Sequence, residues 1–304
     1  MPDFTEQFLI DIADKKSLPS FNDPWDTSHA SSSFEDWKEV TLAAFRKVAS
    51  TASGLALLQA FQSTLKRTIV EPLNGSECNA HGSAVHEFVG PREYWAKVKF
   101  DPHTYMSGSE CYRKRSGANP RYNHGALPDE VLFHELSHAL RGILSPRHPD
   151  ELTGGLKRYG SVEEFYAVVL TNIYISDATN GHSSGLRADH NHGFPLEKEL
   201  SGSFTFYESS PQTFPLINQL VKENLDFCRK LAAIKASFNP LAAYFQNFHA
   251  IKAMSQSCLA KRREVLIQKL PLPKLPQVPM TVPKPGTIAK ILADEALAIL
   301  NVLR

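Results

Sequence analysis

His134, Glu135 and His138 form the pattern His-Glu-x-x-His within a segment whose apolar residues recur with helical spacing. Residues four positions apart lie on one face of a helix, so both imidazoles point in the same direction. Two neutral imidazoles placed in this way can bind one Zn²⁺ ion. Glu135 then lies beside the metal, where it can take a proton from the attacking water and pass it to the leaving amine. The pattern predicts a zinc-dependent peptidase.

A buried helix that carries two core histidines without a metal is the alternative explanation. Each ring would then be buried and would need a hydrogen-bond partner of its own. Leu132, Leu136, Ala139 and Ile143 fall on the side away from the histidines. These residues can anchor the helix in the core while the histidines face a site, which favours the metal-binding interpretation.

A catalytic zinc ion needs a third protein ligand in addition to one open position. In metzincins this ligand is a histidine that follows a glycine shortly after the second histidine of the motif. The chain has Arg141 and Leu144 at these two positions, so the metzincin class is excluded. The other arrangement takes a glutamate from a later helix, and Glu163 and Glu164 stand at the start of the apolar helical segment 162–176.

Glu164 is favoured over Glu163 as this third ligand. The run Glu164-Phe165-Tyr166-Ala167 resembles the Glu-Phe-Phe-Ala ligand segment of anthrax lethal factor. A structural role is the alternative, because Ser161 and Glu164 also have the spacing of a helix capping box.

The same resemblance implies a catalytic role for Tyr159, which is followed by glycine as in lethal factor. A phenol at that position would donate a hydrogen bond to the oxyanion that develops in the transition state. An ordinary aromatic residue at the edge of a loop is the alternative for Tyr159.

A loop rich in Gly, His and Asn, residues 178–195, is a further candidate part of the site. Asp189 could orient a zinc-binding histidine through the second nitrogen of its ring. Either His190 or His192 could be a ligand or could stabilise the oxyanion, and Arg187 adds a cation nearby. A solvated loop without a chemical role is the alternative.

The elements that must position these residues predict an α+β protein with a zincin-like metalloprotease domain. Strand-like segments at 68–73 and 94–102 come before the active-site helix, 130–142, in which Asp129 would be the cap and Gly142 the stop. Helical segments at 34–49 and 54–66 come earlier, and a mainly helical half follows, with runs near 213–236 and 240–268.

The chain is predicted to have four parts. Residues 1–33 are polar and contain Pro and Ser, which predicts a flexible leader. Residues 34–268 form the zincin-like catalytic domain with its helical C-terminal part. Residues 269–286 are rich in proline, which predicts an extended linker. Residues 287–304 are expected to form a short amphipathic helix.

Composition narrows the classes of function. The formal net charge is +1, so nucleic-acid binding is not expected, and no apolar run is long enough to predict a membrane span. The four cysteines, Cys78, Cys111, Cys228 and Cys258, are widely separated. This spacing predicts isolated thiols, as in a reducing compartment, and not a disulfide framework. The N-terminus has no pattern of a standard signal peptide.

The stretch from about 129 to 192 resembles the NleD-type effector zinc metallopeptidases of pathogenic bacteria. The segments that carry this resemblance are VLFHELSHALRG (131–142), EEFYAVVLTNIY (163–174) and LRADHNHG (186–193). The resemblance implies a gluzincin-like site with His134, Glu135, His138 and Glu164. It also implies a protein that is secreted without a standard signal peptide, is delivered into the host cell cytoplasm and cleaves a host protein, for which a mitogen-activated protein kinase is a candidate.

The leading hypothesis is therefore a zinc endopeptidase effector or toxin, with the strand near 94–102 holding the substrate in an extended form along the cleft. The alternative is an effector without proteolytic activity. In that case the zincin core would be a scaffold, and the proline-rich C-terminal region would dock a partner. Hydrolysis of a non-peptide bond by zinc is a third hypothesis.

Overall fold

A computed structural model of the chain describes residues 6–13, 34–73, 78–89, 91–116, 124–145, 148, 150–152, 154–181, 184–190, 195–197 and 202–269. The chain divides into two compact units, residues 1–260 and 261–304. The sheet, the core and the candidate site all belong to the first unit. The expected proline-rich linker after residue 269 and the C-terminal helix at 287–304 lie outside the described residues.

The fold is α+β, as the sequence predicts, with eight α-helices and one four-stranded mixed sheet among the described residues. The strand order is β1-β2-β4-β3. The three parallel strands are β1 (Ile10–Ile12), β2 (Thr68–Glu71) and β4 (Arg92–Lys99). The fourth strand, β3 (His81–Val89), lies at one edge of the sheet and is antiparallel to β4. β2 and β4 confirm the two strands that the sequence predicts, whereas β1 and β3 were not expected.

The prediction of a flexible leader over residues 1–33 is wrong for residues 6–13, while residues 1–5 lie outside the described part of the chain. A 3₁₀ turn, Glu6–Phe8, leads into β1, which pairs with β2 and is buried. Asp11 in this strand is buried and accepts a hydrogen bond from the Tyr94 hydroxyl at 2.8 Å. Residues 14–33 lie outside the described part of the chain.

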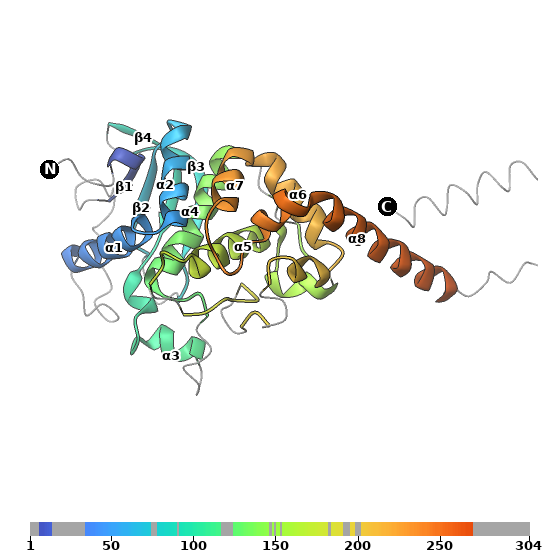
Figure 1. The fold of residues 1–304 in the computed structure, drawn as a ribbon. Helices are drawn as coiled ribbons and strands as arrows, with labels where there is room; N and C mark the ends of the chain where they lie inside the picture. The colour runs from blue at the N-terminus through green and yellow to red at the C-terminus, as the bar shows by residue number, and fades with distance from the viewer. Residues whose placement is uncertain are drawn as a thin grey trace, which may run out of the picture. The chain divides into compact units, whose positions relative to one another are not determined.

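Four helices surround the core next to the sheet, namely α1 (Phe34–Ala49), α2 (Ala52–Thr64), α4 (Pro128–Leu144) and α5 (Val162–Ser176). In Figure 1, α4 lies between the strands and α5. Contacts of α4 with β3, β4, α1, α2 and α5 make it the central helix of the core.

The remaining described elements are helical, in agreement with the predicted helical half. Short elements connect the main ones: the 3₁₀ turns Pro102–Tyr105, Gly154–Tyr159 and Thr205–Glu208, and the helix α3 (Glu110–Ser116). The later helices are α6 (Thr213–Glu223), α7 (Leu225–Ala232) and α8 (Pro240–Lys269), the last with a kink at Asn247.

Helix α4 begins and ends differently from the expectation. The N-cap is Leu127, whose backbone N–H donates to Glu130 Oε2 at 2.9 Å, so Asp129 is not the cap. Asp129 lies in the first turn and accepts a hydrogen bond from the Tyr174 hydroxyl of α5 at 2.6 Å. Gly142 is not the stop, because the helix continues to Leu144.

Two glycines allow α4 and β3 to approach closely. A Cβ atom added to Gly82 of β3 would collide with the Glu135 carbonyl oxygen of α4. A Cβ atom added to Gly142 would lie 2.8 Å from the Ala84 Cβ of β3. Any larger side chain at either position would push the strand away from the helix, so these glycines set the distance between β3 and the histidine-bearing helix.

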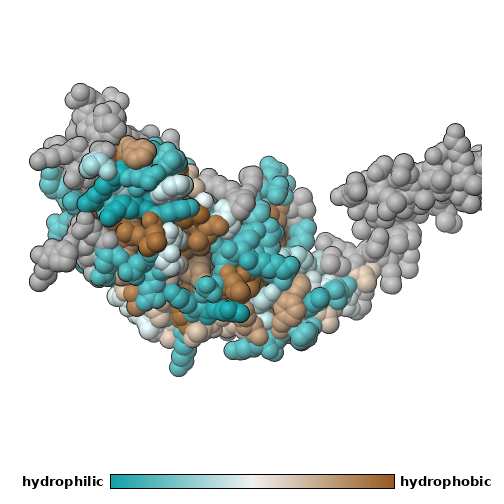
Figure 2. All heavy atoms as spheres, turned by 90° about the horizontal axis from the view of Figure 1, so that it is seen from above, coloured by the Kyte–Doolittle hydropathy of each residue, from teal (hydrophilic) through white to brown (hydrophobic). Residues whose placement is uncertain are grey.

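One face of the molecule is mostly polar. On the face that Figure 2 shows, hydrophilic residues cover most of the described surface and hydrophobic residues form a few separate groups. Within the described residues, no helix is both long and apolar enough to span a bilayer.

Cys78 and Cys111 form a disulfide, which corrects the expectation of four isolated thiols. Cys78 lies just before β3, and Cys111 belongs to α3. Cys228 is a buried free cysteine and Cys258 an exposed one. The spacing of the cysteines carried no sign of this bond, because the two residues are brought together by the fold and are 33 positions apart in sequence.

Removal of this disulfide is expected to destabilise the protein. A cross-link over a loop of this length lowers the entropy of the unfolded chain, which corresponds to about 3–4 kcal/mol of stability. The double variant Cys78→Ser/Cys111→Ser should therefore unfold at lower urea concentration than the wild type under oxidising conditions. The control is Cys258→Ser, which removes an exposed free thiol and should leave the midpoint unchanged. Equal midpoints for the double variant and the wild type would contradict the disulfide.

Candidate metal centre

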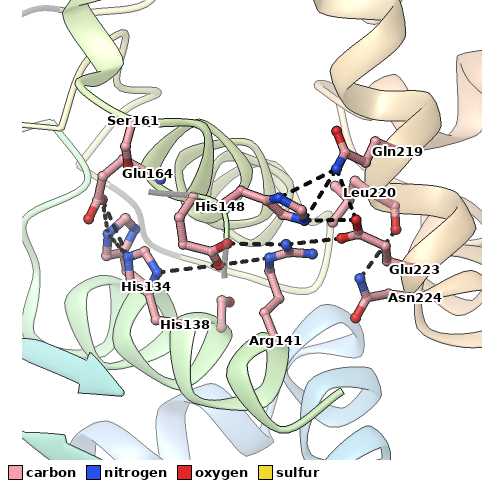
Figure 3. Close-up of polar contacts among 12 residues, drawn as sticks. His134, His138, Arg141, His148, Ser161, Glu164, Gln219, Leu220, Glu223 and Asn224 are labelled. Atoms are coloured by element: carbon pink, nitrogen blue, oxygen red, sulfur yellow. Dashed lines mark hydrogen bonds and ion pairs between the residues drawn. The ribbon is translucent and has the colours of Figure 1, made fainter. Parts of the chain in front are cut away.

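The two histidines of α4 and one glutamate of α5 converge on one point (Figure 3). His134 Nε2 and His138 Nε2 lie 3.2 Å apart, and each lies 3.3 Å from Glu164 Oε2. The ligand atoms of the three side chains all lie within 4.8 Å of one another. His134 and His138 are buried, and Glu164 is partly exposed.

These three residues fit a metal ion by the chemistry of their donor atoms. Two imidazole nitrogens and one carboxylate oxygen are a ligand set that divalent transition metals accept. The carboxylate and the two imidazoles face one another in a largely buried place. A cation between them would contact all three side chains and would balance the buried negative charge. The group His134, His138 and Glu164 can therefore bind a metal ion.

His134 is held in the neutral form that binds a metal. Burial, and then the Arg187 guanidinium, keep the pKa of His134 well below its usual value. Arg187 Nη2 lies 3.3 and 3.4 Å from the two ring nitrogens. On the other side, His134 Nδ1 lies 3.2 Å from Thr171 Oγ1, whose own hydroxyl donates to the Ala167 carbonyl at 2.7 Å. Thr171 Oγ1 can thus accept a hydrogen bond from Nδ1–H and leave Nε2 for the metal.

His138 has acidic neighbours. Glu163 Oε1 lies 3.7 Å from His138 Nδ1, on the opposite side of the ring from Glu164. Burial alone would lower the pKa of His138, but the carboxylates of Glu163 and Glu164 outweigh it and raise this pKa to about 10. Without a metal, His138 therefore carries a proton at neutral pH. The positive charge of this proton balances the nearby carboxylates, as the charge of a metal ion would.

The structure places Glu163 outside the ligand group, in an ion pair with Arg141. Arg141 Nε donates to Glu163 Oε1 at 2.8 Å, and both residues are buried. His138 and Arg141 counteract the effect of burial and lower the pKa of Glu163 to about 2. This geometry favours Glu164 as the third ligand and gives Glu163 a role in orienting His138.

Arg141 also links the site to α6 (Figure 3). Its Nη2 lies 3.4 Å from Glu223 Oε2, and His148 Nε2 lies 2.8 Å from Glu223 Oε1. Gln219 Nε2 donates to Glu223 Oε1 at 3.0 Å. The helical half of the unit therefore helps to fix the ion pair that supports His138.

The capping box, the alternative explanation for Glu164, is only half formed, because only the bond to the Ser161 side chain is made. Its backbone N–H donates to Ser161 Oγ at 3.2 Å, while its carboxylate points to the histidines. Burial raises the pKa of Glu164, but bonds from His134, His138 and His190 lower it far below its usual value. The carboxylate is therefore ionised, as a metal ligand must be.

Glu135 and two of the ligands, His138 and Glu164, line a common cavity of about 390 Å³. Burial raises the pKa of Glu135, and this effect exceeds that of His138, which lowers it. A carboxylate with a raised pKa is a better proton acceptor at neutral pH. The described residues that line the cavity are Asn79, Ala80, His81, Gly82, Glu135, His138, Ser161, Glu163, Glu164 and His190.

Tyr159 and the 187–192 loop are placed in different ways. Tyr159 is buried, packs edge-on against Phe165 with ring centroids 5.1 Å apart, and is not among the described residues that line the cavity. Asp189 is buried and His190 lines the cavity. His192 lies outside the described residues. The structure thus brings His190, but not Tyr159, to the cavity.

Sequence reasoning missed two parts of the site. The segment 79–82, which leads into β3, forms one wall of the cavity. The sequence did not predict a strand here, because the residues are small and alternate only weakly between apolar and polar types. Thr171 was detectable in principle, because it stands seven residues after Glu164 and so shares its helix face.

Comparison of the chain with models of known protein families, with curated proteins and with solved structures found no match in any of the three.

The neighbours Glu163 and Glu164 are expected to differ in their effect on metal binding. Glu164→Gln removes a charged ligand, so the affinity for Zn²⁺ should fall by more than about 100-fold, beyond the effect typical of residues that only support a ligand. Glu163→Gln leaves the three ligands in place and should cost about 10–100-fold. Competition with a chromogenic chelator measures both, and circular dichroism checks that each variant is folded. A larger loss for Glu163→Gln would reverse the assignment.

Metal affinity is expected to rise with pH. Below its pKa of about 10, His138 holds a proton that the metal must displace. Each unit of decrease in pH should therefore weaken binding by about tenfold over the neutral range. Calorimetric titration in buffers of different ionisation enthalpy gives the number of protons released. Binding without proton release would show that His138 is neutral in the metal-free protein.

Proposed function

We propose that the chain is a zinc-dependent endopeptidase. The observation that carries the proposal is that Glu135 and the ligands His138 and Glu164 line one cavity, with His134 completing the buried ligand group. A peptidase of this class needs a metal, a general base and room for a peptide in one place.

Zinc is the metal that we propose. Two histidines and one glutamate form the ligand set of catalytic zinc sites that keep an open position. A zincin-like fold is consistent with the arrangement, because the histidines lie on a helix next to a mixed sheet and the third ligand comes from the following long helix, α5. The cavity beside the ligands provides space for the open position.

Each side chain of the proposed site has its own role in peptide hydrolysis. Zinc bound to the three ligands would supply a Lewis acid that polarises the scissile carbonyl. Glu135 accepts a proton from the attacking water and transfers it to the leaving nitrogen, for which its raised pKa is suited. His134 is kept neutral by burial and Arg187, and Glu163 supports His138 from behind. Tyr159 would need to move in order to reach a substrate in the cavity.

The edge strand β3 is the proposed binding surface for the substrate backbone. The sequence-based hypothesis assigned this role to the strand near 94–102, but β4 is an inner strand, paired with β2 and β3. The segment that lines the cavity leads into β3, which has a neighbour on one side only among the described residues. An extended peptide can add to such an edge through backbone hydrogen bonds.

The resemblance to NleD-type effectors suggests the biological setting. We propose that the chain is a secreted effector or toxin that reaches the host cell cytoplasm without a standard signal peptide and cleaves a host protein there. A mitogen-activated protein kinase is a candidate substrate by that resemblance. The proline-rich segment, on which the alternative of a docking effector rests, lies outside the described residues.

Glu135→Gln tests the proposal. The amide has the same shape but cannot accept the proton, so peptide cleavage should fall by a factor on the order of 10³. Zinc affinity should stay close to that of the wild type, because Glu135 is not one of the three ligands. Cleavage is measured by N-terminal proteomics of host-cell lysate treated with the zinc-loaded protein.

The matched control is Glu208→Gln, a change in the turn Thr205–Glu208 away from the cavity, which should leave cleavage intact. Equal cleavage by Glu135→Gln and by the wild type would refute the proposed role of Glu135. A zinc-loaded wild type that cuts no protein would refute the peptidase itself.

A further inference from the structure

A histidine from the loop after α5 makes the closest polar contact to the proposed ligand Glu164. His190 Nδ1 lies 2.6 Å from Glu164 Oε2, whereas the nitrogens of His134 and His138 are both 3.3 Å from that oxygen. A distance of this size is typical of a strong hydrogen bond to a charged group. His190 also lines the cavity.

His190 is close to the ligand group without being part of it. The side chains whose ligand atoms lie within 4.8 Å of one another are those of His134, His138 and Glu164. The ring centroids of His190 and His134 are 6.2 Å apart. The position of His190 is therefore explained by its hydrogen bond to the Glu164 carboxylate.

The loop that carries His190 is anchored to the same helix as Glu164. The Asn172 side chain of α5 accepts a hydrogen bond from the Arg187 backbone N–H at 3.0 Å and donates to the Arg187 carbonyl at 2.8 Å. Asp189, the neighbour of His190, is only 4% exposed. Because one helix fixes both the loop and the glutamate, the contact between His190 and Glu164 is a built feature of the fold.

We propose that His190 is a positioning residue that holds Glu164 in the orientation needed for metal binding. Its Nδ1–H donates to Glu164 Oε2 and thereby selects one orientation of a carboxylate whose terminal torsion is otherwise broadly free. Partners of this kind change metal affinity by about 10–100-fold in other sites. The inference rests on the metal site of the proposed function, and it does not depend on the peptide-cleaving reaction.

Three substitutions separate this hydrogen bond from the other contributions of the ring. His190→Asn places an amide N–H near the position of Nδ1, His190→Gln places it near the position of Nε2, and His190→Ala removes both nitrogens. Affinity of the full chain for Zn²⁺, measured by chelator competition, should fall by about 10–100-fold in His190→Ala and in His190→Gln. His190→Asn should bind zinc within about threefold of the wild type, because it keeps the bond to Glu164.

The control for a general effect of histidine replacement is His249→Asn, at an exposed position of α8. It should leave zinc affinity unchanged. If His190→Ala does not fold, the comparison between His190→Asn and His190→Gln still decides the question, since both keep a polar side chain.

Two results would overturn the inference. Wild-type zinc affinity in both His190→Ala and His190→Gln would show that Glu164 needs no support. An equal loss in all three variants would identify the ring itself as the essential group, as for a metal ligand. Zinc binding with the expected pattern but without cleavage of any protein would refute the proposed function alone, whereas cleavage with zinc affinity insensitive to His190 would refute this inference alone.

Discussion

The close packing of α4 between β3 and α5 is the constraint on which the candidate site depends. Gly82 lets the strand approach the Glu135 carbonyl, and Gly142 lets the helix approach Ala84. On its other side α4 contacts α5, which carries Glu164. Since both neighbours are fixed by the same helix, the cavity wall, the base and the ligands keep one geometry.

Charge balance explains why so many ionisable side chains can be buried together. The Glu163 carboxylate is matched by Arg141, and the Glu164 carboxylate by the surrounding imidazoles. An isolated buried charge would be very costly, so each of these groups needs its partner. In the metal-free protein a proton on His138 supplies part of the positive charge, and a divalent cation would supply it more fully.

The sequence predicts the periodic and local features of the protein well. The helices that carry His134, His138 and Glu164 have apolar residues with clear helical spacing, so their existence follows from the pattern. The resemblance to the lethal factor segment indicated Glu164 as the residue that joins the two histidines. Three features depend on contacts between distant residues and have no local signal: the pairing of β1 with β2, the role of β3 as an edge, and the ion pair that removes Glu163 from the ligand group.

The disulfide before β3 lies next to the cavity, so the cavity wall can exist with this bond either formed or reduced. Cys78 directly precedes the lining residues 79–82, so the bond to Cys111 tethers one wall of the cavity to α3. Whether such a bond persists is decided by the thiol–disulfide potential of the surroundings. A chain isolated in air and the same chain in a glutathione-rich cytoplasm would thus differ at this wall, and biochemical work on the protein has redox state as one of its variables.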